Sequence, residues 1–248
     1  MTIEPKNLKT QVYEDFNQRN KKAEEWSEDR VLVSLIQSQR PMILDVGAYT
    51  GTSAIRFRNL FPQARLVCFE PNPAAREELE KTASRLGGDI RVSDLAVSDA
   101  EGTTKFIVQG INPGLSGLVR RNLNSKDSIA LSQGTNVDTS QINLSEIEVK
   151  TSRLDSIDFL SGESVDLLKI DVQSCEAKVL SGAQRLLART SVMMVEVSFY
   201  DLYENRSSFR AIEEFTEPAG LTLWAITTHS RNPMNGRTDW VNVVYSRN

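Results

Sequence analysis

The sequence Met42-Ile-Leu-Asp-Val-Gly-Ala-Tyr-Thr-Gly51 decides how the rest of the chain is interpreted. Its apolar start, residues 42–46, has the length and composition of a strand buried on both faces of a parallel sheet. Gly47 and Gly51 follow and allow a tight turn with close backbone approach to a ligand. This stretch is therefore predicted to be the first strand and glycine turn of a nucleotide-binding α/β domain.

Composition narrows the class of protein. The 248 residues include 40% hydrophobic and 25% charged residues, which is typical of a globular chain of one domain. A net charge of −4 gives no general attraction to nucleic acid or to anionic lipid. No apolar run approaches the roughly 20 residues needed to span a bilayer, and the polar start lacks a signal-peptide core. A cytoplasmic protein with reduced cysteines at Cys68 and Cys175 is expected, without nucleic-acid or membrane partners.

Strand and helix patterns alternate along most of the chain. Helical periodicity covers residues 7–39, 52–60, 74–86, 176–189 and 208–217. Strand patterns cover residues 65–69, 90–97, 102–108, 147–151, 164–172, 192–197, 221–226 and 240–245. The alternation predicts an α/β fold: a Rossmann-like, doubly wound, mostly parallel sheet with helices on both faces and an antiparallel C-terminal edge hairpin.

Two segments stand apart from this domain. Residues 1–40 are predicted to be an N-terminal helical segment, and residues 41–248 the ligand-binding domain. Within that domain, residues 109–145 are rich in Asn, Ser, Gly and Gln, and a polar insertion of this length is usually functional or disordered. Both interpretations, a substrate loop and plain disorder, stay open.

The spacing of the glycines discriminates between cofactors. Dinucleotide-binding turns have the spacing G-x-G-x-x-G, whereas Gly47 and Gly51 are four residues apart, and no Walker-type Gly-Lys-Ser/Thr occurs. Asp45 places a carboxylate before the turn, which suits a ligand carrying an ammonium and a sulfonium better than one carrying phosphates. S-adenosylmethionine is therefore favoured over a dinucleotide.

Ligands of doubly wound sheets bind beyond the carboxyl ends of the strands. Glu70 ends the second strand about twenty residues after the glycine turn, where a carboxylate can accept hydrogen bonds from both ribose hydroxyls. Further cofactor-binding candidates in the turn and at the strand ends are Asp45, Gly47, Ala48, Tyr49, Gly51, Pro71, Asn72, Asp94, Ala96 and Asp171.

Four motifs in order carry a family resemblance: Ile43-Leu-Asp-Val-Gly-Ala-Tyr-Thr-Gly51, Val67-Cys-Phe-Glu-Pro-Asn-Pro73, Leu168-Lys-Ile-Asp-Val-Gln-Ser-Cys-Glu176 with Val179-Leu-Ser-Gly-Ala183, and Val195-Glu196. Together they resemble the FkbM-type S-adenosylmethionine-dependent methyltransferases, over most of residues 42–197. The resemblance implies a class I methyltransferase fold, S-adenosylmethionine as cofactor, and O-methylation of a hydroxyl on a sugar or secondary metabolite.

The sequence departs from that pattern at two places. The family usually has Asn where Tyr49 stands, and Gly-Ala where Ser174-Cys175 stand. The first departure is expected to change the contacts of the glycine turn with the cofactor. The second is expected to change the turn that follows Asp171, and with it the substrate or the catalytic geometry.

Methyl transfer to an alkyl hydroxyl requires alignment of the acceptor oxygen and removal of its proton. Asp171, at the end of the central strand, is the leading candidate for the general base, and a capping or cofactor-orienting role is the alternative. Glu196 ends the neighbouring strand and is expected to orient the acceptor, to join Asp171 on a divalent cation, or to hold its turn. His229, the only histidine, is a third catalytic candidate, although a surface position is the more common one.

The sequence thus predicts an O-methyltransferase for a small hydroxylated acceptor, in which a divalent cation and a homo-oligomer remain open. Two alternatives stay beside it: a dinucleotide-dependent oxidoreductase, and a cofactor-binding module without catalytic activity.

Overall fold

The computed structural model describes residues 26–110, 112–125, 128–129, 143–232 and 236–247. The predicted helix content before residue 26, and residues 111, 126–127 and 130–142 of the polar insertion, lie outside the described residues. Of the predicted N-terminal helical segment, the structure describes α2 (Glu28–Leu35), whose Val31 and Leu32 are buried.

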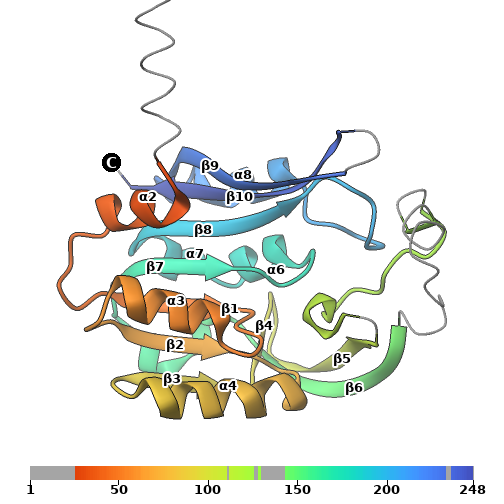
Figure 1. Ribbon diagram of the computed structural model, residues 1–248, viewed down its shortest axis with the longest axis horizontal. Helices are drawn as coiled ribbons and strands as arrows, with labels where there is room; N and C mark the ends of the chain where they lie inside the picture. The colour runs from red at the N-terminus through yellow and green to blue at the C-terminus, as the bar shows by residue number, and fades with distance from the viewer. Residues whose placement is uncertain (1–25, 111, 126–127, 130–142, 233–235, 248) are drawn as a thin grey trace, which may run out of the picture.

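A seven-stranded sheet forms the centre of the described chain (Figure 1). Its strands lie in the order β3 (Ile90–Ser93), β2 (Arg65–Phe69), β1 (Met42–Val46), β7 (Val165–Ile170), β8 (Thr190–Ser198), β10 (Thr238–Ser246) and β9 (Thr222–Arg231). All pairs from β3 to β8 are parallel, and β10 pairs antiparallel with both β8 and β9. The predicted mostly parallel sheet with an antiparallel C-terminal hairpin is confirmed.

The strand order places the ligand-binding edge. From β1 the chain proceeds outward through β2 and β3, then returns to β7 on the other side of β1. The order of strands therefore reverses between β1 and β7, and sheets of this kind bind ligands beyond the carboxyl ends of the strands at such a reversal.

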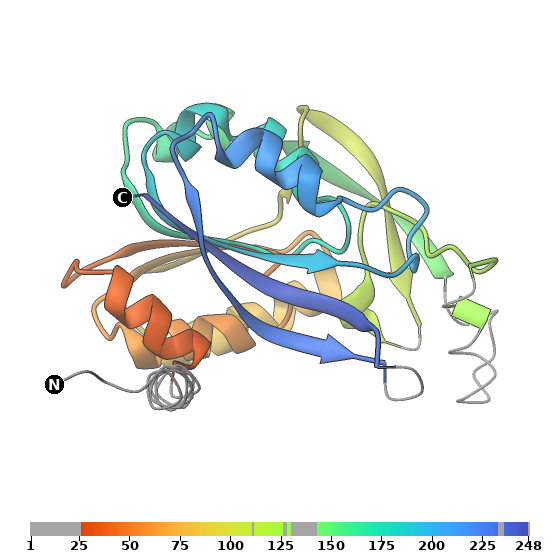
Figure 2. The ribbon, with the colours of Figure 1, turned by 90° about the horizontal axis from the view of Figure 1, so that it is seen from above.

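Helices cover both faces of the sheet (Figure 2). On one face, α2, α3 (Thr52–Leu60) and α4 (Pro73–Leu86) bury one apolar cluster that includes Leu32, Phe57 and Leu79. On the other, α6 (Glu176–Ser181), α7 (Gln184–Leu187) and α8 (Phe209–Thr216) bury a larger one. β1 contributes to both clusters, which explains why its residues 42–46 are all apolar except Asp45.

The single helix expected over residues 176–189 is two helices. The break falls at Gly182, where a Cβ atom would lie 2.1 Å from the backbone oxygen of Ser98. The backbone that follows β4 approaches the helix so closely there that only glycine fits. Two 3₁₀ turns, Leu154–Ser156 and Asp158–Leu160, come between β6 and β7 in the chain.

The strand expected over residues 90–97 is also divided. After β3 the chain leaves the main sheet at Asp94 and Leu95, and β4 (Ala96–Val97) pairs with β6 (Asn143–Ser152) in a second sheet. β5 (Gly102–Gln109) pairs antiparallel with β6 and completes this sheet in the order β4-β6-β5. The strand predicted at 102–108 is thus confirmed, but its partner is the strand after the polar insertion.

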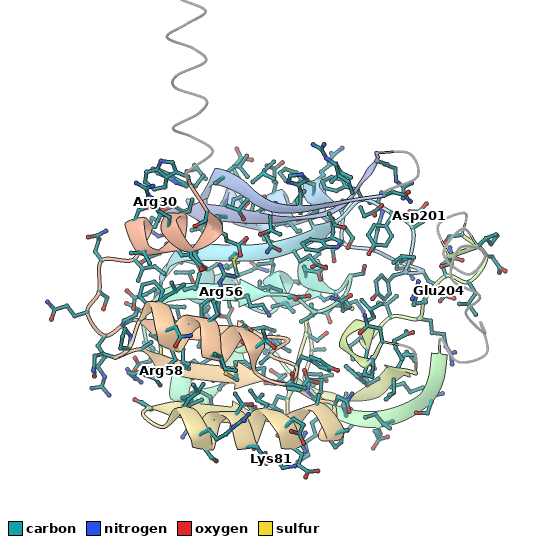
Figure 3. All side chains as sticks on the ribbon, viewed as in Figure 1. Arg30, Arg56, Arg58, Lys81, Asp201 and Glu204 are labelled. Carbon is teal, nitrogen blue, oxygen red and sulfur yellow. The ribbon has the colours of Figure 1, made fainter. Side chains whose placement is uncertain are left out.

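Arg56 connects helix α3 with helix α2 (Figure 3). It extends from α3 to α2, where its guanidinium lies 2.7 Å from Glu28 Oε1 and 2.5 Å from Asp29 Oδ1. Glu28 also accepts hydrogen bonds from the Thr227 and Thr228 hydroxyls of β9. Glu28 therefore fastens α2 to the edge strand as well as to α3.

Part of the polar insertion forms backbone contacts with the segment after β8. The Asn122 N–H donates to the Leu202 carbonyl at 2.8 Å, and the Glu204 N–H donates to the Arg120 carbonyl at 3.1 Å. Asp201 and Glu204 mark this segment in Figure 3. The described part of the insertion is thus held beside the carboxyl edge of the main sheet.

Both cysteines are buried and form no disulfide, as the sequence predicts. Burial raises the pKa of the Cys175 thiol to about 12, so the thiol form dominates at neutral pH. Among the described residues, no helix combines the length and the apolar character that a membrane crossing requires.

Tyr245 is fully buried in the core, and its hydroxyl forms no hydrogen bond within the described part of the chain. Burial raises the pKa of this hydroxyl, so it stays neutral. It is nevertheless a buried polar group without a hydrogen-bond partner among the described residues. Tyr245→Phe is expected to leave the free energy of unfolding unchanged or raise it by up to about 1 kcal/mol, measured by urea denaturation. Tyr203→Phe, which removes a hydroxyl with two acceptors, is the matched comparison and is expected to be destabilising. A clear loss of stability in Tyr245→Phe would contradict the assignment.

Candidate active site

The glycine turn lies between the carboxyl ends of β2 and β7 and contacts the backbone of both. The N–H groups of Gly47 and Ala48 both donate to the Phe69 carbonyl at 3.1 Å. Gly47 has φ +83°, and a Cβ atom there would lie 1.9 Å from the backbone oxygen of Asp171. Only glycine fits this position, because a side chain would both strain the backbone and separate β1 from β7.

The carboxylate of Glu70 is held by two backbone N–H groups, one from the glycine turn and one from the start of α4. Its Oε2 accepts from the Tyr49 N–H at 2.9 Å and its Oε1 from the Asn72 N–H at 2.8 Å. Burial raises the pKa of Glu70, and the two N–H groups oppose this shift. Each carboxylate oxygen can accept a second hydrogen bond, so Glu70 retains acceptor capacity toward the cavity that it lines.

Lys169 lies under the glycine turn, in the middle of the carboxyl edge. Its Nζ is 2.9 Å from Asp45 Oδ1, 2.9 Å from the Gly47 carbonyl oxygen and 3.7 Å from Asp171 Oδ2. The other oxygen of Asp45 accepts from the Ser53 hydroxyl of α3. Burial alone lowers the pKa of Lys169, but the charges of Asp45 and Asp171 outweigh it and raise the pKa, so the ammonium is retained.

Asp171 and Glu196 lie at the ends of neighbouring strands, and Gln173 connects them. The Gln173 Nε2 donates to Asp171 Oδ1 at 2.8 Å, and the Gln173 side chain also hydrogen-bonds Glu196. Burial raises the pKa of Glu196 to about 9, with further contributions from the nearby charges of Asp171 and Glu176. At neutral pH the site therefore holds a protonated Glu196 beside Asp171.

The turn after Asp171 depends on Glu176, the first residue of α6. Glu176 Oε1 accepts from the N–H groups of Ser174 at 3.0 Å and Val172 at 3.3 Å. Burial raises the pKa of Glu176 to about 7. Gln173 and Ser174 have φ values of +55° and +79° in this turn, a region that non-glycine residues rarely adopt.

These groups surround a cavity of about 400 Å³, within the usual range of roughly 300–1,000 Å³ for small-molecule sites. The cavity is lined by the carboxyl ends of β1, β2, β7 and β8, by β4, by the start of α3, and by the loop around the 3₁₀ turn η1 (Pro113–Leu115). Trp240 and Asn242 of β10 line it as well. Because the strands lie in the order β2-β1-β7-β8-β10, Glu70 and Asn242 are on opposite sides of the β1–β7 pair.

The Methyltransferase FkbM domain matches residues 45–220, which include the glycine turn, the turn after Asp171, Glu70 and Glu196. This chain belongs to the FkbM methyltransferase family. The methyltransferase is 34% identical to the 2-O-methyltransferase NoeI of Sinorhizobium fredii over 189 residues, which is 74% of each chain. It is 26% identical to the methyltransferase sdnD of Sordaria araneosa, covering 57% of this chain and 60% of that protein. A solved precorrin-6y C5,15-methyltransferase from Geobacter metallireducens aligns with a TM-score of 0.46 and 12% identity, covering 88% of this chain and 86% of the other.

Family membership implies S-adenosylmethionine as the methyl donor. The described residues suit such a ligand: the cavity is large enough, and Glu70 offers a fixed acceptor inside it. A dinucleotide-dependent oxidoreductase is not favoured by the family or by its relatives.

The predicted site residues fall into three groups in the methyltransferase. Eight of them line the cavity: Gly47, Ala48, Tyr49, Glu70, Pro71, Ala96, Asp171 and Glu196. Asp45, Gly51 and Asn72 instead support the site from outside its lining, because Asp45 pairs with Lys169, Gly51 begins α3 and Asn72 caps α4.

Two predicted residues lie away from the cavity lining. Asp94 is exposed, 4.0 Å from Lys150, because the chain leaves the main sheet immediately after β3. His229 is exposed on β9, the last strand of the sheet, and β10 separates it from Glu196. Neither side chain is brought together with Asp171.

Several lining residues were missed from the sequence: Lys169, Gln173, Trp240 and Asn242. Lys169 carried a usable signal, since a lysine inside the apolar run of a central strand must have a buried partner. Trp240 and Asn242 carried none. They begin a strand, and only the antiparallel pairing of β10 with β8 brings the start of a strand to the carboxyl edge of the others.

Both departures from the family pattern coincide with left-handed backbone. Tyr49 has φ +48°, where Asn is tolerated better, and Ser174 has φ +79°, where glycine is free of strain. Tyr49 and Ser174 donate their N–H groups to Glu70 and Glu176 respectively. The carboxylates therefore stabilise conformations that the residue types themselves disfavour.

A metal site is not apparent at this edge of the sheet. Among the described residues, no group of three or more His, Cys, Asp or Glu side chains is arranged to hold a metal ion. The divalent cation considered for Asp171 and Glu196 stays an open prediction.

Lys169→Met is expected to lower the free energy of unfolding by about 3–5 kcal/mol, because Asp45 is then buried without its counter-charge. The double variant Asp45→Asn/Lys169→Met is expected to regain part of this loss, and urea denaturation of all four combinations measures the coupling. Lys81→Met removes a lysine from the exposed face of α4 and is expected to leave the unfolding midpoint unchanged. Additive losses in the double variant would contradict the buried pair.

Glu196 gives the protein a specific dependence of stability on pH. Its raised pKa means that the folded state keeps a proton which the unfolded chain, with an ordinary value of 4.5, has lost. Its contribution is therefore complete below about pH 4.5 and is lost as the pH rises toward 9. Glu196→Gln is expected to raise Tm by about 3 °C or more at pH 9, with the difference shrinking toward pH 5, in thermal scans.

Glu214→Gln, an exposed change on α8, is the control and is expected to show no such pH-dependent difference. A Tm difference between Glu196→Gln and the wild type that stays constant from pH 5 to pH 9 would contradict the assignment.

Proposed function

We propose that this methyltransferase transfers the methyl group of S-adenosylmethionine to a hydroxyl of a sugar or secondary metabolite. The observation that carries the proposal is Asp171, a half-exposed carboxylate that projects into the cavity one strand away from the turn assigned to the cofactor. The name of NoeI, a 2-O-methyltransferase, supports an oxygen acceptor.

The cofactor is assigned to the β1–β2 side of the cavity. Glu70 would accept hydrogen bonds from the two ribose hydroxyls, and the turn from Gly47 to Tyr49, together with Pro71 and Ala96, would form the surrounding wall. When bound, S-adenosylmethionine supplies an electrophilic methyl group on its sulfonium. Asp45 does not reach it in this assignment, because Lys169 and Ser53 already use its two oxygens.

The acceptor is assigned to the β8–β10 side. Trp240 offers an apolar surface and Asn242 an amide that can donate to or accept from a hydroxyl. Asp171 would take the proton of the acceptor hydroxyl, with the Lys169 ammonium 3.7 Å from its Oδ2. Glu196, protonated at neutral pH, would instead donate a hydrogen bond that orients the acceptor.

A cofactor-binding module without activity is the second candidate, suggested by Ser174 and Cys175 in place of the usual family residues. The geometry gives it little support. Ser174 keeps the turn through its N–H to Glu176, and Asp171 and Glu196 both line the cavity. An assay for S-adenosylhomocysteine production with a panel of hydroxylated acceptors separates the two candidates.

The homo-oligomer stays a prediction. The large exposed apolar side chains of β9, which are Leu223, Trp224 and Ile226, lie on the last strand of the sheet and are the natural place to look for a subunit contact.

Glu70→Gln and Asp171→Asn are expected to separate binding from turnover. Glu70→Gln should weaken S-adenosylhomocysteine binding about tenfold or more in isothermal titration, because an amide can accept at only one of its two atoms. Asp171→Asn should keep that affinity within about threefold and lower kcat by about 10² to 10⁴. If the wild-type protein does not bind S-adenosylhomocysteine, the cofactor assignment is wrong. If Asp171→Asn leaves kcat unchanged, Asp171 is not the general base.

A further inference from the structure

Tyr203 is a buried tyrosine whose hydroxyl reaches the site without lining the cavity. Its Oη lies 2.7 Å from Gln173 Oε1 and 3.1 Å from the Leu115 carbonyl oxygen. The side chain is only 4% exposed, and burial raises the pKa of its hydroxyl, so Tyr203 is a neutral donor. It therefore connects the segment after β8 with the turn after Asp171 and with η1.

The hydroxyl of Tyr203 and the carboxylate of Asp171 together fix which way the amide of Gln173 points. A side-chain amide has one accepting and one donating end, and the two can exchange by a rotation about the last bond. Tyr203 donates to the oxygen end, which leaves the nitrogen end facing Asp171 at 2.8 Å and Glu196. The reverse orientation would place the amide oxygen against the Asp171 carboxylate, which is unfavourable when that carboxylate is ionised.

The backbone of both residues is held independently of these side-chain contacts. Tyr203 forms a β-bridge with Arg121, and the next residue, Glu204, donates its N–H to the Arg120 carbonyl. Gln173 has φ +55°, and the N–H groups of Val172 and Ser174 on either side of it are bound by Glu176. Removal of one polar atom from Tyr203 or Gln173 should thus leave the turns in place.

We propose that Gln173 and Tyr203 are positioning residues for methyl transfer: Tyr203 locks the Gln173 amide, and Gln173 holds the Asp171 carboxylate directed at the acceptor. The inference rests on the proposed function, because Asp171 is the base in it. Neither residue takes the acceptor proton. Their effect is expected to reach the reaction through the Asp171 carboxylate, which Gln173 contacts at 2.8 Å.

Other charges act on the same carboxylate and must stay constant in a test. Lys169 of β7 lies 3.7 Å from Asp171, and Asp45 of β1 pairs with that lysine. Glu196 of β8 and Glu176 of α6 also interact electrostatically with Asp171. Tyr203→Phe and Gln173→Met change none of these charges, so a change in the behaviour of Asp171 reports the amide contact.

Tyr203→Phe and Gln173→Met are expected to lower kcat about 5- to 20-fold and about 10- to 100-fold, with the affinity for S-adenosylhomocysteine within about threefold of the wild type. The loss should fall on kcat alone, because the contact that orients the Asp171 carboxylate is removed while the Glu70 side of the cavity is unchanged. Tyr245→Phe removes another buried hydroxyl, outside the cavity lining, and should leave kcat and the affinity unchanged.

A second measurement does not depend on turnover. The ¹³C chemical shift of the Asp171 carboxyl, assigned by its absence in Asp171→Asn, is compared at one fixed pH in the wild type and both variants. A changed chemical shift in both variants, from the lost or misdirected amide contact, supports the proposal even if the wild type methylates no hydroxylated acceptor, in which case only the proposed function fails. An unchanged chemical shift in both variants would overturn the proposal, and so would a loss of S-adenosylhomocysteine binding that matches the loss of kcat.

Discussion

A buried ammonium between two carboxylates is the constraint on which the rest of the site depends. Lys169 sits in the middle of the sheet and contacts Asp45 at 2.9 Å, Asp171 at 3.7 Å and the carbonyl of the glycine turn at 2.9 Å. A charge in this position is stable only when its partners are close and well oriented. Lys169 therefore ties the end of β1 to the end of β7, the two strands between which the order of the sheet reverses.

The cavity has two chemically different sides, one on each side of the β1–β7 pair that Lys169 connects. On the β2 side, Glu70 is held by two backbone N–H groups and presents its remaining acceptor capacity. On the β8 side, Asp171 and Glu196 share the amide of Gln173, and burial leaves Glu196 protonated at neutral pH. In the proposed function, one carboxylate binds the cofactor, one accepts a proton and one donates a hydrogen bond, although their side chains are chemically alike.

Two carboxylates also hold the turns that shape the cavity. Glu70 binds the N–H of Tyr49, and Glu176 binds the N–H of Ser174, so each stabilises a left-handed residue that is not glycine. Conformations of this kind persist only where the surroundings determine them strongly. The contacts explain how the chain accommodates Tyr49 and Ser174 at the two places where it departs from its family.

Residues 42–51 and the alternation of strand and helix patterns determined the fold, because burial on both faces and backbone freedom at Gly47 are local properties of the sequence. Glu70, Asp171 and Glu196 could be predicted for the same reason, since each ends a recognisable strand. The tertiary structure alone decided that Asp94 and His229 stay outside, because the chain leaves the sheet after β3 and because β10 lies between β8 and β9. It also decided that Trp240, Asn242 and Tyr203 reach the site, since antiparallel pairing and contacts between distant segments are not encoded in any local pattern.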